Sequence, residues 1–282
     1  MAKVTVAMRQ DLRIQAEQFL CMHGFAAPPL DPEQAIAAQK LRVAQLSLDD
    51  LLIKANLPPE DHLKIQAMLD ARKRHIVFRL GLGQQKRNWG SLHEIAHDVL
   101  PWQRQLLYYC PLIFMPEHIQ QQFEIEADIF AAEAFFFGES FKKYASEGNF
   151  GLATAIDLAN RLYETSFHAT FAHYVEQSDV PCCLIIWRID SRQDDAWYPG
   201  DLSIVYYVRS RTFCGHLEPR QVLRDKELVD TILNNTTSNG IVKHDLYLNA
   251  NNKEPIVIPA ESFYNGYNVF TLFQQHDLIH KT

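Results

Sequence analysis

The chain has 282 residues, of which 47% are hydrophobic and 22% are charged, as expected for a globular protein with one large or two modest domains. Its net charge of −7 argues against a general attraction to nucleic acid. The N-terminus lacks the apolar core of a signal peptide, no apolar run reaches membrane-spanning length, and the five cysteines include no CxxC pair. We therefore expect a cytoplasmic protein without membrane contact.

The first 73 residues are predicted to be mainly helical. Apolar residues at helical spacing predict a helix over 9–22, and Asp31-Pro32-Glu33 is a strong start for a second helix over 31–46. A short helix is predicted over 47–55 and another over 60–73. Packing explains these helices better than a DNA-binding helix-turn-helix does.

The first predicted strand covers residues 75–80 and is closed by the glycines of the following Gly-Leu-Gly. All charged residues from Arg72 to Arg87 are positive. One interpretation is a solvated edge strand that its charge protects from aggregation. The other is an edge that receives a substrate peptide as an added strand, which we favour if a metal site follows in the chain.

A metal-binding pattern follows this strand. The sequence His93-Glu94-Ile95-Ala96-His97 matches HExxH within an apolar run, with Ser91 as a possible helix cap and Pro101 as the expected stop. On a helix, imidazoles four residues apart share one face and can bind one metal ion, while Glu94 can act as general base. The alternative is a chance pentapeptide on a core helix.

A catalytic zinc site needs a third protein ligand, and the next helix can supply it. After an apolar connection over 101–116, which could form a pocket wall or lid, apolar spacing predicts a helix over 117–137. Glu124 and Glu126 both qualify as ligands by position. Asp128 lies one turn after Glu124 and can hydrogen-bond a ligand histidine. We therefore choose Glu124, although helical spacing alone does not separate the two.

HEIAH followed by EIEADIFAAEAFF resembles the ImmA/IrrE family of zinc metallopeptidases, over about residues 74–140. The resemblance implies a mostly helical, zincin-like peptidase domain that makes a limited cut in a partner helix-turn-helix repressor during DNA-damage, stress or anti-phage responses. It also implies roles for the matching residues: His93, His97 and Glu124 would bind one Zn²⁺ per chain, Glu94 would be the general base, and Asp128 would hold a ligand histidine. The upstream helices and the segment 108–116 depart from the family pattern.

Four further residues are candidates for the same chemistry. Cys110 lies between the two metal-binding helices, and its thiolate could close the open position on zinc and keep the enzyme latent. The alternative is a buried, inert thiol. Tyr108, Tyr109 and His168 are candidate donors to the oxyanion or the substrate, and the sequence does not rank them.

The remainder of the chain changes character. We predict a domain over 1–140, a helical, helix-turn-helix-like linker over 141–178, and a second domain over 179–282. The second domain should contain one helix, 219–235, and five strands: 182–189, 202–210, 240–248, 255–259 and 267–273. The whole chain is therefore expected to be α+β, and its end resembles the small GAF-like sensor domains that follow the peptidase in some family members.

Such a sensor domain could bind a small-molecule or nucleic-acid activator. The overall interpretation is a zinc endopeptidase under the control of a signal. The alternative is a non-proteolytic regulatory or sensor protein whose zinc site is structural and permanently closed. Glu94 argues against this alternative, because a structural site needs no base.

Overall fold

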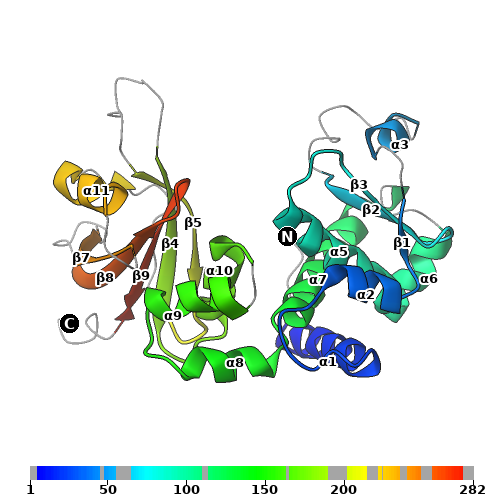
Figure 1. The fold of residues 1–282 in the computed structure, drawn as a ribbon, viewed down its shortest axis with the longest axis horizontal. Coiled ribbons are helices and arrows are strands. Elements are labelled where there is room, and N and C mark those ends of the chain that lie inside the picture. The colour runs from blue at the N-terminus through cyan, green and yellow to red at the C-terminus, as the bar shows by residue number, and fades with distance from the viewer. Residues whose placement is uncertain are drawn as a thin grey trace. The chain divides into compact units, whose positions relative to one another are not determined.

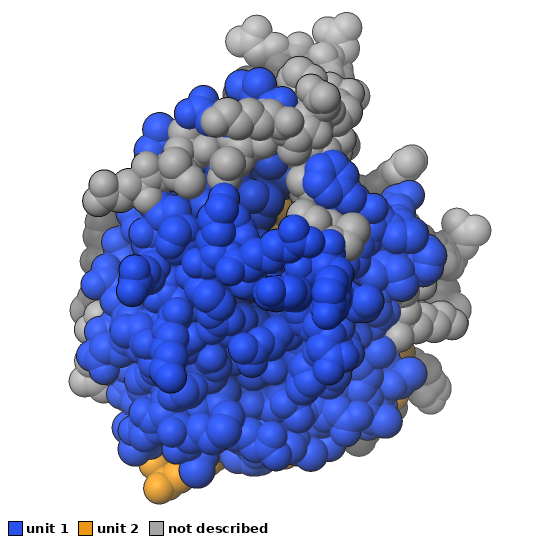
Figure 2. Space-filling view, turned by 90° about the vertical axis from the view of Figure 1, so that its right-hand side faces the viewer, with its two compact units in different colours: residues 1–141 blue, residues 142–282 orange. Residues whose placement is uncertain are grey.

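The computed structural model describes these residues: 5–44, 48–54, 65–109, 114–162, 165–189, 202–214, 222–223, 225–235, 240–248 and 256–275. The chain is α+β, as predicted, and divides into two compact units, residues 1–141 and 142–282 (Figure 2). In the described part of the chain, none of the helices combines the length and the apolar character that crossing a membrane requires.

The first unit contains helices around a small sheet (Figure 1). Its helices are α1 (Val6–Met22), α2 (Pro32–Ala38), α3 (Leu48–Lys54), α5 (Gln84–Val99), α6 (Pro101–Tyr109) and α7 (Glu117–Phe135). Its strands are β1 (Arg42–Val43), β2 (Ala67–Asp70) and β3 (His75–Phe78), and α8 (Glu139–Ser146) crosses the division between the units. The helices predicted over 9–22, 47–55 and 117–137 are confirmed with small changes of boundary.

The small sheet differs from the prediction in two ways. The strand predicted over 75–80 is β3, and it is the middle strand, because β1 pairs with it in parallel and β2 pairs with it antiparallel. It therefore cannot accept an added strand, and β2 lies at an edge of the sheet that the described residues form. The helix predicted over 60–73 is also wrong in its described part, because β2 forms a hairpin with β3 through residues 71–74. The helical spacing of apolar residues over 60–73 carries no information about the backbone pairing with β3 that makes residues 67–70 a strand.

The helix predicted over 31–46 is shorter than expected. It ends as α2 at Ala38, Lys40 adopts a positive φ of 56°, and β1 then follows at Arg42–Val43. Asp31 caps α2 as predicted, since its carboxylate accepts the Glu33 backbone N–H at 2.9 Å. The parallel pairing of Arg42 and Val43 with β3 takes the place of the predicted helix there, and residues 45–46 of the prediction lie outside the described residues.

The HExxH motif lies on α5, but this helix begins earlier than predicted. Gly83 precedes its first turn, and Ser91 lies inside the helix with its hydroxyl donating to the Arg87 carbonyl at 2.8 Å. Ser91 is therefore not a cap. The helix ends at Val99, and Pro101 then starts α6, where its fixed φ and missing N–H suit a first helical position. Residues 101–109 are thus helical, not the irregular connection expected.

Buried apolar contacts hold α7 in place. Helix α1 buries Leu12, Ala16 and Phe19 in the core of this unit. The rings of Phe19 and Phe130, on α1 and α7, lie 5.9 Å apart between centroids. α7 also packs along α5. The two helices that carry the predicted metal ligands are therefore neighbours in one core.

The second unit is built on a six-stranded sheet with the order β6-β5-β4-β9-β8-β7, in which all neighbouring strands are antiparallel. Its strands are β4 (Cys182–Ile189), β5 (Leu202–Arg209), β6 (Val222–Leu223), β7 (Ile241–Leu248), β8 (Ile256–Tyr264) and β9 (Asn268–Gln274). All five predicted strands are present, with β8 longer than expected. The predicted helix 219–235 is confirmed only as the shorter α11 (Lys226–Leu233), because Val222–Leu223 pairs with β5 as a strand.

Helices cover both faces of this sheet (Figure 1). On one face, Val229 and Ile232 of α11 pack against Trp187 and its neighbours. On the other, Phe171 of α10 (Phe167–Glu176) packs against Phe270, with ring centroids 5.1 Å apart. Residues 142–178, most of the predicted linker, belong to the second unit and form the rest of α8, α9 (Leu152–Asp157), the π-helical turn η2 (Leu158–Leu162) and α10.

Candidate metal centre

Helix α5 presents both histidines of the HExxH motif toward α7. Because they are four residues apart, their rings lie on one face, with centroids 5.0 Å apart and planes at 80°. His97 is almost completely buried, with 4% of its side chain exposed, whereas 14% of the His93 side chain is exposed. The buried neighbours Leu92, Ile95 and Ala96 keep this part of α5 in the core.

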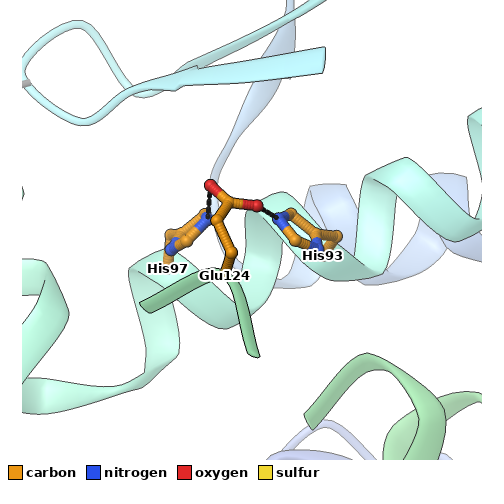
Figure 3. Close-up of side chains that lie close together, drawn as sticks. All are labelled: His93, His97 and Glu124. Carbon is orange, nitrogen blue, oxygen red and sulfur yellow. Dashed lines mark ion pairs between the residues drawn. The ribbon is translucent and has the colours of Figure 1, made fainter. Parts of the chain in front are cut away.

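Glu124 completes a group of three potential ligands. Its carboxylate extends from α7 between the two imidazoles (Figure 3). The Glu124 Oε2 lies 3.0 Å from His93 Nε2, and Oε1 lies 3.9 Å from His97 Nε2. One ligand atom from each of the three residues falls within 4.8 Å of the others. The structure therefore brings together the three residues chosen from the sequence.

The other nitrogen of each imidazole has a separate partner. His93 Nδ1 lies 2.9 Å from Asp128 Oδ1, and His97 Nδ1 lies 2.6 Å from Gln103 Oε1. Both partner atoms are oxygens that can accept a hydrogen bond from Nδ1. The Nε2 atom of each ring therefore faces Glu124. Metal-binding histidines in proteins are oriented by such contacts at their second nitrogen.

The charges of this group depend on burial and on one another. Burial lowers the pKa of His93, but the hydrogen bonds that its ring donates to Asp128 and Glu124, with the charges of Glu94 and Glu124, outweigh this and raise the pKa to about 10. Burial and the nearby charge of His93 lower the pKa of His97 to about 4. Burial alone would raise the pKa of Glu124, yet its hydrogen bond to His93 and the charge of that ring lower it. A bound cation would take the place of the His93 proton.

Glu94 lies beside this group without joining it. It is 5% exposed and accepts a hydrogen bond from the backbone N–H of Leu69 in the edge strand β2. Burial raises its pKa to about 7, although the charge of His93 acts in the opposite direction. A carboxyl group with this pKa can take up and release a proton near neutral pH.

The donor set suits zinc. Two imidazole nitrogens and one carboxylate oxygen form the three-ligand set of catalytic zinc sites, and the remaining position stays open to water or substrate. About half of the Glu124 side chain is exposed, at 49%, so the group can be reached from solvent. The residues present therefore fit a zinc ion that is accessible at one side.

Glu126, the alternative third ligand, points elsewhere. Its carboxylate accepts hydrogen bonds from Trp102 Nε1, Gln103 Nε2 and Gln122 Nε2, at 2.7, 2.7 and 2.8 Å. It is 6% exposed and is used by these three donors. Helical spacing could not separate it from Glu124, because the choice depends on the position of α6 relative to α7.

Tyr108, Tyr109 and His168 are not part of the group of three ligands. Tyr108 and Tyr109, at the end of α6, are 51% and 76% exposed, and their carbonyl oxygens accept hydrogen bonds from Arg72. His168 lies in the second unit, where its Nε2 is hydrogen-bonded to the Tyr206 hydroxyl. Cys110 lies outside the described residues.

The sequence interpretation missed three residues that shape the site. Gln103 and Trp102 on α6 were assigned to an irregular connection, so their contacts with His97 and Glu126 could not be anticipated. Arg74, in the β2–β3 turn, forms an ion pair with the buried Asp98 next to His97. An aspartate directly after the second histidine was a visible signal, because a carboxylate near a helix C-terminus requires a positive partner.

No family model matches this chain, and no curated protein matches it either. A solved structure described as a Mycobacterium tuberculosis transcriptional regulator matches with a TM-score of 0.54 and 15% sequence identity. The match covers 96% of this chain and 78% of that protein. At this identity the likeness shows a similar fold and nothing about activity.

Proposed function

We propose that this protein is a zinc-dependent endopeptidase that makes a limited cut in a partner protein, in agreement with its sequence resemblance to the ImmA/IrrE family. The observation that carries the proposal is the convergence of His93 Nε2, His97 Nε2 and the Glu124 carboxylate, with Glu94 buried beside them. His93, His97 and Glu124 would hold the ion. A zinc ion bound there would supply Lewis acidity toward a water molecule and a peptide carbonyl.

The chain's own residues supply the proton transfer and the orientation. The Glu94 carboxylate accepts the proton of the attacking water and later donates it to the nitrogen of the leaving amine. In the metal-free protein, burial raises the pKa of Glu94 to about 7. Asp128 and Gln103 hold the rings of His93 and His97, so that both Nε2 atoms keep their direction.

The edge strand β2 supports a peptide as the substrate. The Leu69 N–H of β2 reaches Glu94, so this edge runs beside the proposed base. An extended peptide that adds to β2 as a further strand would present its backbone carbonyl groups near Glu94. This is the role that the sequence interpretation had given to residues 75–80, now transferred to the strand that forms the edge.

A regulatory role agrees with the architecture. The matched solved structure is described as a transcriptional regulator, and the proposed substrate is a helix-turn-helix repressor. In the second unit, which we propose to be a GAF-like sensor, a pocket of about 530 Å³ lies over β7, β8 and β9. It is a candidate site for a small-molecule or nucleic-acid activator. We place the enzyme in the cytoplasm, which suits the free thiols of Cys21 and Cys214.

The proposal is tested with the whole chain and with any helix-turn-helix repressor that is found to be encoded beside its gene. Wild type should contain one zinc per chain and cut the repressor at one position, with or without an added stress signal. Glu94→Gln should keep the zinc and lose the cleavage. Equal cleavage by both proteins would contradict the proposal. Stoichiometric zinc without cleavage of the repressor, or of any protein in a cell extract under any stimulus, would support the non-proteolytic alternative with a structural zinc site.

A further inference from the structure

A chain of buried hydrogen bonds leads from His97 to the interior of the first unit. Gln103 is fully buried on α6, and its Oε1 lies 2.6 Å from His97 Nδ1. Its Nε2 donates to Glu126 Oε2 at 2.7 Å and to the Phe123 carbonyl at 3.3 Å. Gln103 therefore connects the second histidine of the motif to α7 through buried hydrogen bonds.

The orientation of the Gln103 amide is determined by its surroundings. The Glu126 carboxylate and the Phe123 carbonyl are both acceptors, so the NH₂ group of Gln103 must face them. A reversed amide would place its oxygen against two other oxygens. The Gln103 oxygen must then face His97, and only a protonated Nδ1 can donate to it. This leaves the lone pair of His97 on Nε2.

Glu126 is itself held as an acceptor. Its Oε2 receives Trp102 Nε1 in addition to Gln103, and its Oε1 receives Gln122 Nε2. Three donors around a carboxylate with 6% exposure compensate for its burial. Each hydrogen bond of the series is therefore donated in the same direction, from His97 to Gln103 and from Gln103 to Glu126.

We propose that Gln103 and Glu126 are positioning residues that set the tautomer of His97, so that its Nε2 lone pair faces the metal. The inference rests on the metal site of the proposed function. It explains why Glu126 is buried so close to Glu124 without reaching the ligand group. The neutral Gln103 amide lies between Glu126 and His97 and orients the His97 ring. The carboxylate of Glu126 therefore does not contact His97 directly. His93 uses a different arrangement, a direct contact with the 58%-exposed Asp128.

Four variants of the full-length protein separate this role from general packing. Gln103→Met has a similar length but no hydrogen bonds, and Glu126→Leu removes the acceptor that orients Gln103. Glu126→Gln is the conservative variant, because its amide oxygen can accept from Trp102 and Gln103 while the partly exposed Gln122 turns. Gln121→Met is the matched control, since Gln121 makes the same kind of bond to Glu117 on the exposed side of α7.

Two measurements are made on each variant. The first is the ¹⁵N chemical shift of the imidazole nitrogens in the metal-free protein, which distinguishes the two tautomers; His97 is identified among the 12 histidines by comparison with His97→Gln. The second is zinc affinity, obtained by competition with a chromophoric chelator. Urea unfolding of the metal-free protein verifies that each variant is folded. A merely structural role would change the unfolding but not the tautomer.

Wild type, Glu126→Gln and Gln121→Met should show His97 protonated at Nδ1 and equal zinc affinity. Gln103→Met should lose this preference and bind zinc about 10- to 100-fold more weakly. Glu126→Leu should also lose the preference for the Nδ1-protonated tautomer and should also bind zinc more weakly. If Gln103→Met does not fold, Glu126→Leu tests the inference in its place. An unchanged tautomer and a zinc affinity within about twofold of wild type would overturn the inference. Wild type that binds no zinc would overturn the proposed function instead, while the tautomer measurement would still report on Gln103.

Discussion

Replacement of Glu94 with glutamine should strongly slow cleavage and stabilise the metal-free protein. Burial raises the pKa of Glu94 from its ordinary 4.5 to about 7. The folded protein therefore holds more protons than the unfolded chain between these two values, and its stability falls as the pH rises through this window. At about 1.4 kcal/mol per pH unit, the loss reaches about 3 kcal/mol above pH 7. Glutamine does not ionise, so the variant should gain up to this amount at pH 8 and almost nothing below pH 4.5.

The assay is urea unfolding of the chelator-treated full chain at several pH values, with amide exchange in α5 reporting on the first unit. Glu124→Gln is the matched control, because the pKa of Glu124 is lowered while that of Glu94 is raised, and the expected change in stability has the opposite sign. The hydrogen bond and charge of His93 lower the pKa of Glu124 despite burial, so this carboxylate contributes stability above its unfolded pKa and loses it as the pH falls through the folded value. Glu124→Gln should therefore destabilise the metal-free protein at pH 8.

The catalytic part of the prediction is a fall in cleavage rate of about 10²- to 10⁴-fold for Glu94→Gln, the range expected for loss of a general base. The reasoning is refuted if Glu94→Gln is no more stable than wild type at pH 8. It is also refuted if the gain is the same at pH 4.5 and pH 8, because a pH-independent gain would come from packing and not from the buried charge.

Three further predictions concern the metal and its surroundings. Chelation should abolish cleavage, and zinc at 100 times its dissociation constant should stabilise the first unit by about 2.7 kcal/mol; a melting temperature that responds to neither treatment would contradict the site. Asp128→Ala should weaken zinc binding about 10- to 100-fold, as measured by chelator competition, because His93 Nδ1 loses its partner; unchanged affinity would show that Asp128 does not orient the ring. Arg74→Met should destabilise the protein by about 1–3 kcal/mol, since the 1%-exposed Asp98 would keep only the more distant Arg104, at 3.8 Å, as its cationic partner. Adding Asp98→Asn should recover most of this loss, and an equal loss in the single and double variants would rule out the charge as its cause.

The parts of the fold that sequence reasoning predicted well are those whose signal is local. The helix of Glu117 and the strand from Cys182 show their period within one run of residues, and both are present with nearly the predicted boundaries. The segment 67–70 was predicted incorrectly, because a strand at a sheet edge depends on the neighbour with which it pairs. Residues 101–109 were also missed, since a proline that ends one helix can begin the next.

By itself, the sequence determined which chemistry was available. The spacing of His93 and His97 places two imidazoles on one helical face, and a glutamate on the following helix was expected as their third partner. Only the tertiary structure decided which glutamate this is. Glu124 and Glu126 are two residues apart on α7, and Glu124 faces the histidines of α5 whereas Glu126 faces Gln103 of α6. The tertiary structure also decided which strand lies beside Glu94 and which tautomer His97 adopts. Both depend on hydrogen bonds between segments that are distant in the chain, and helical spacing carries no information about those contacts.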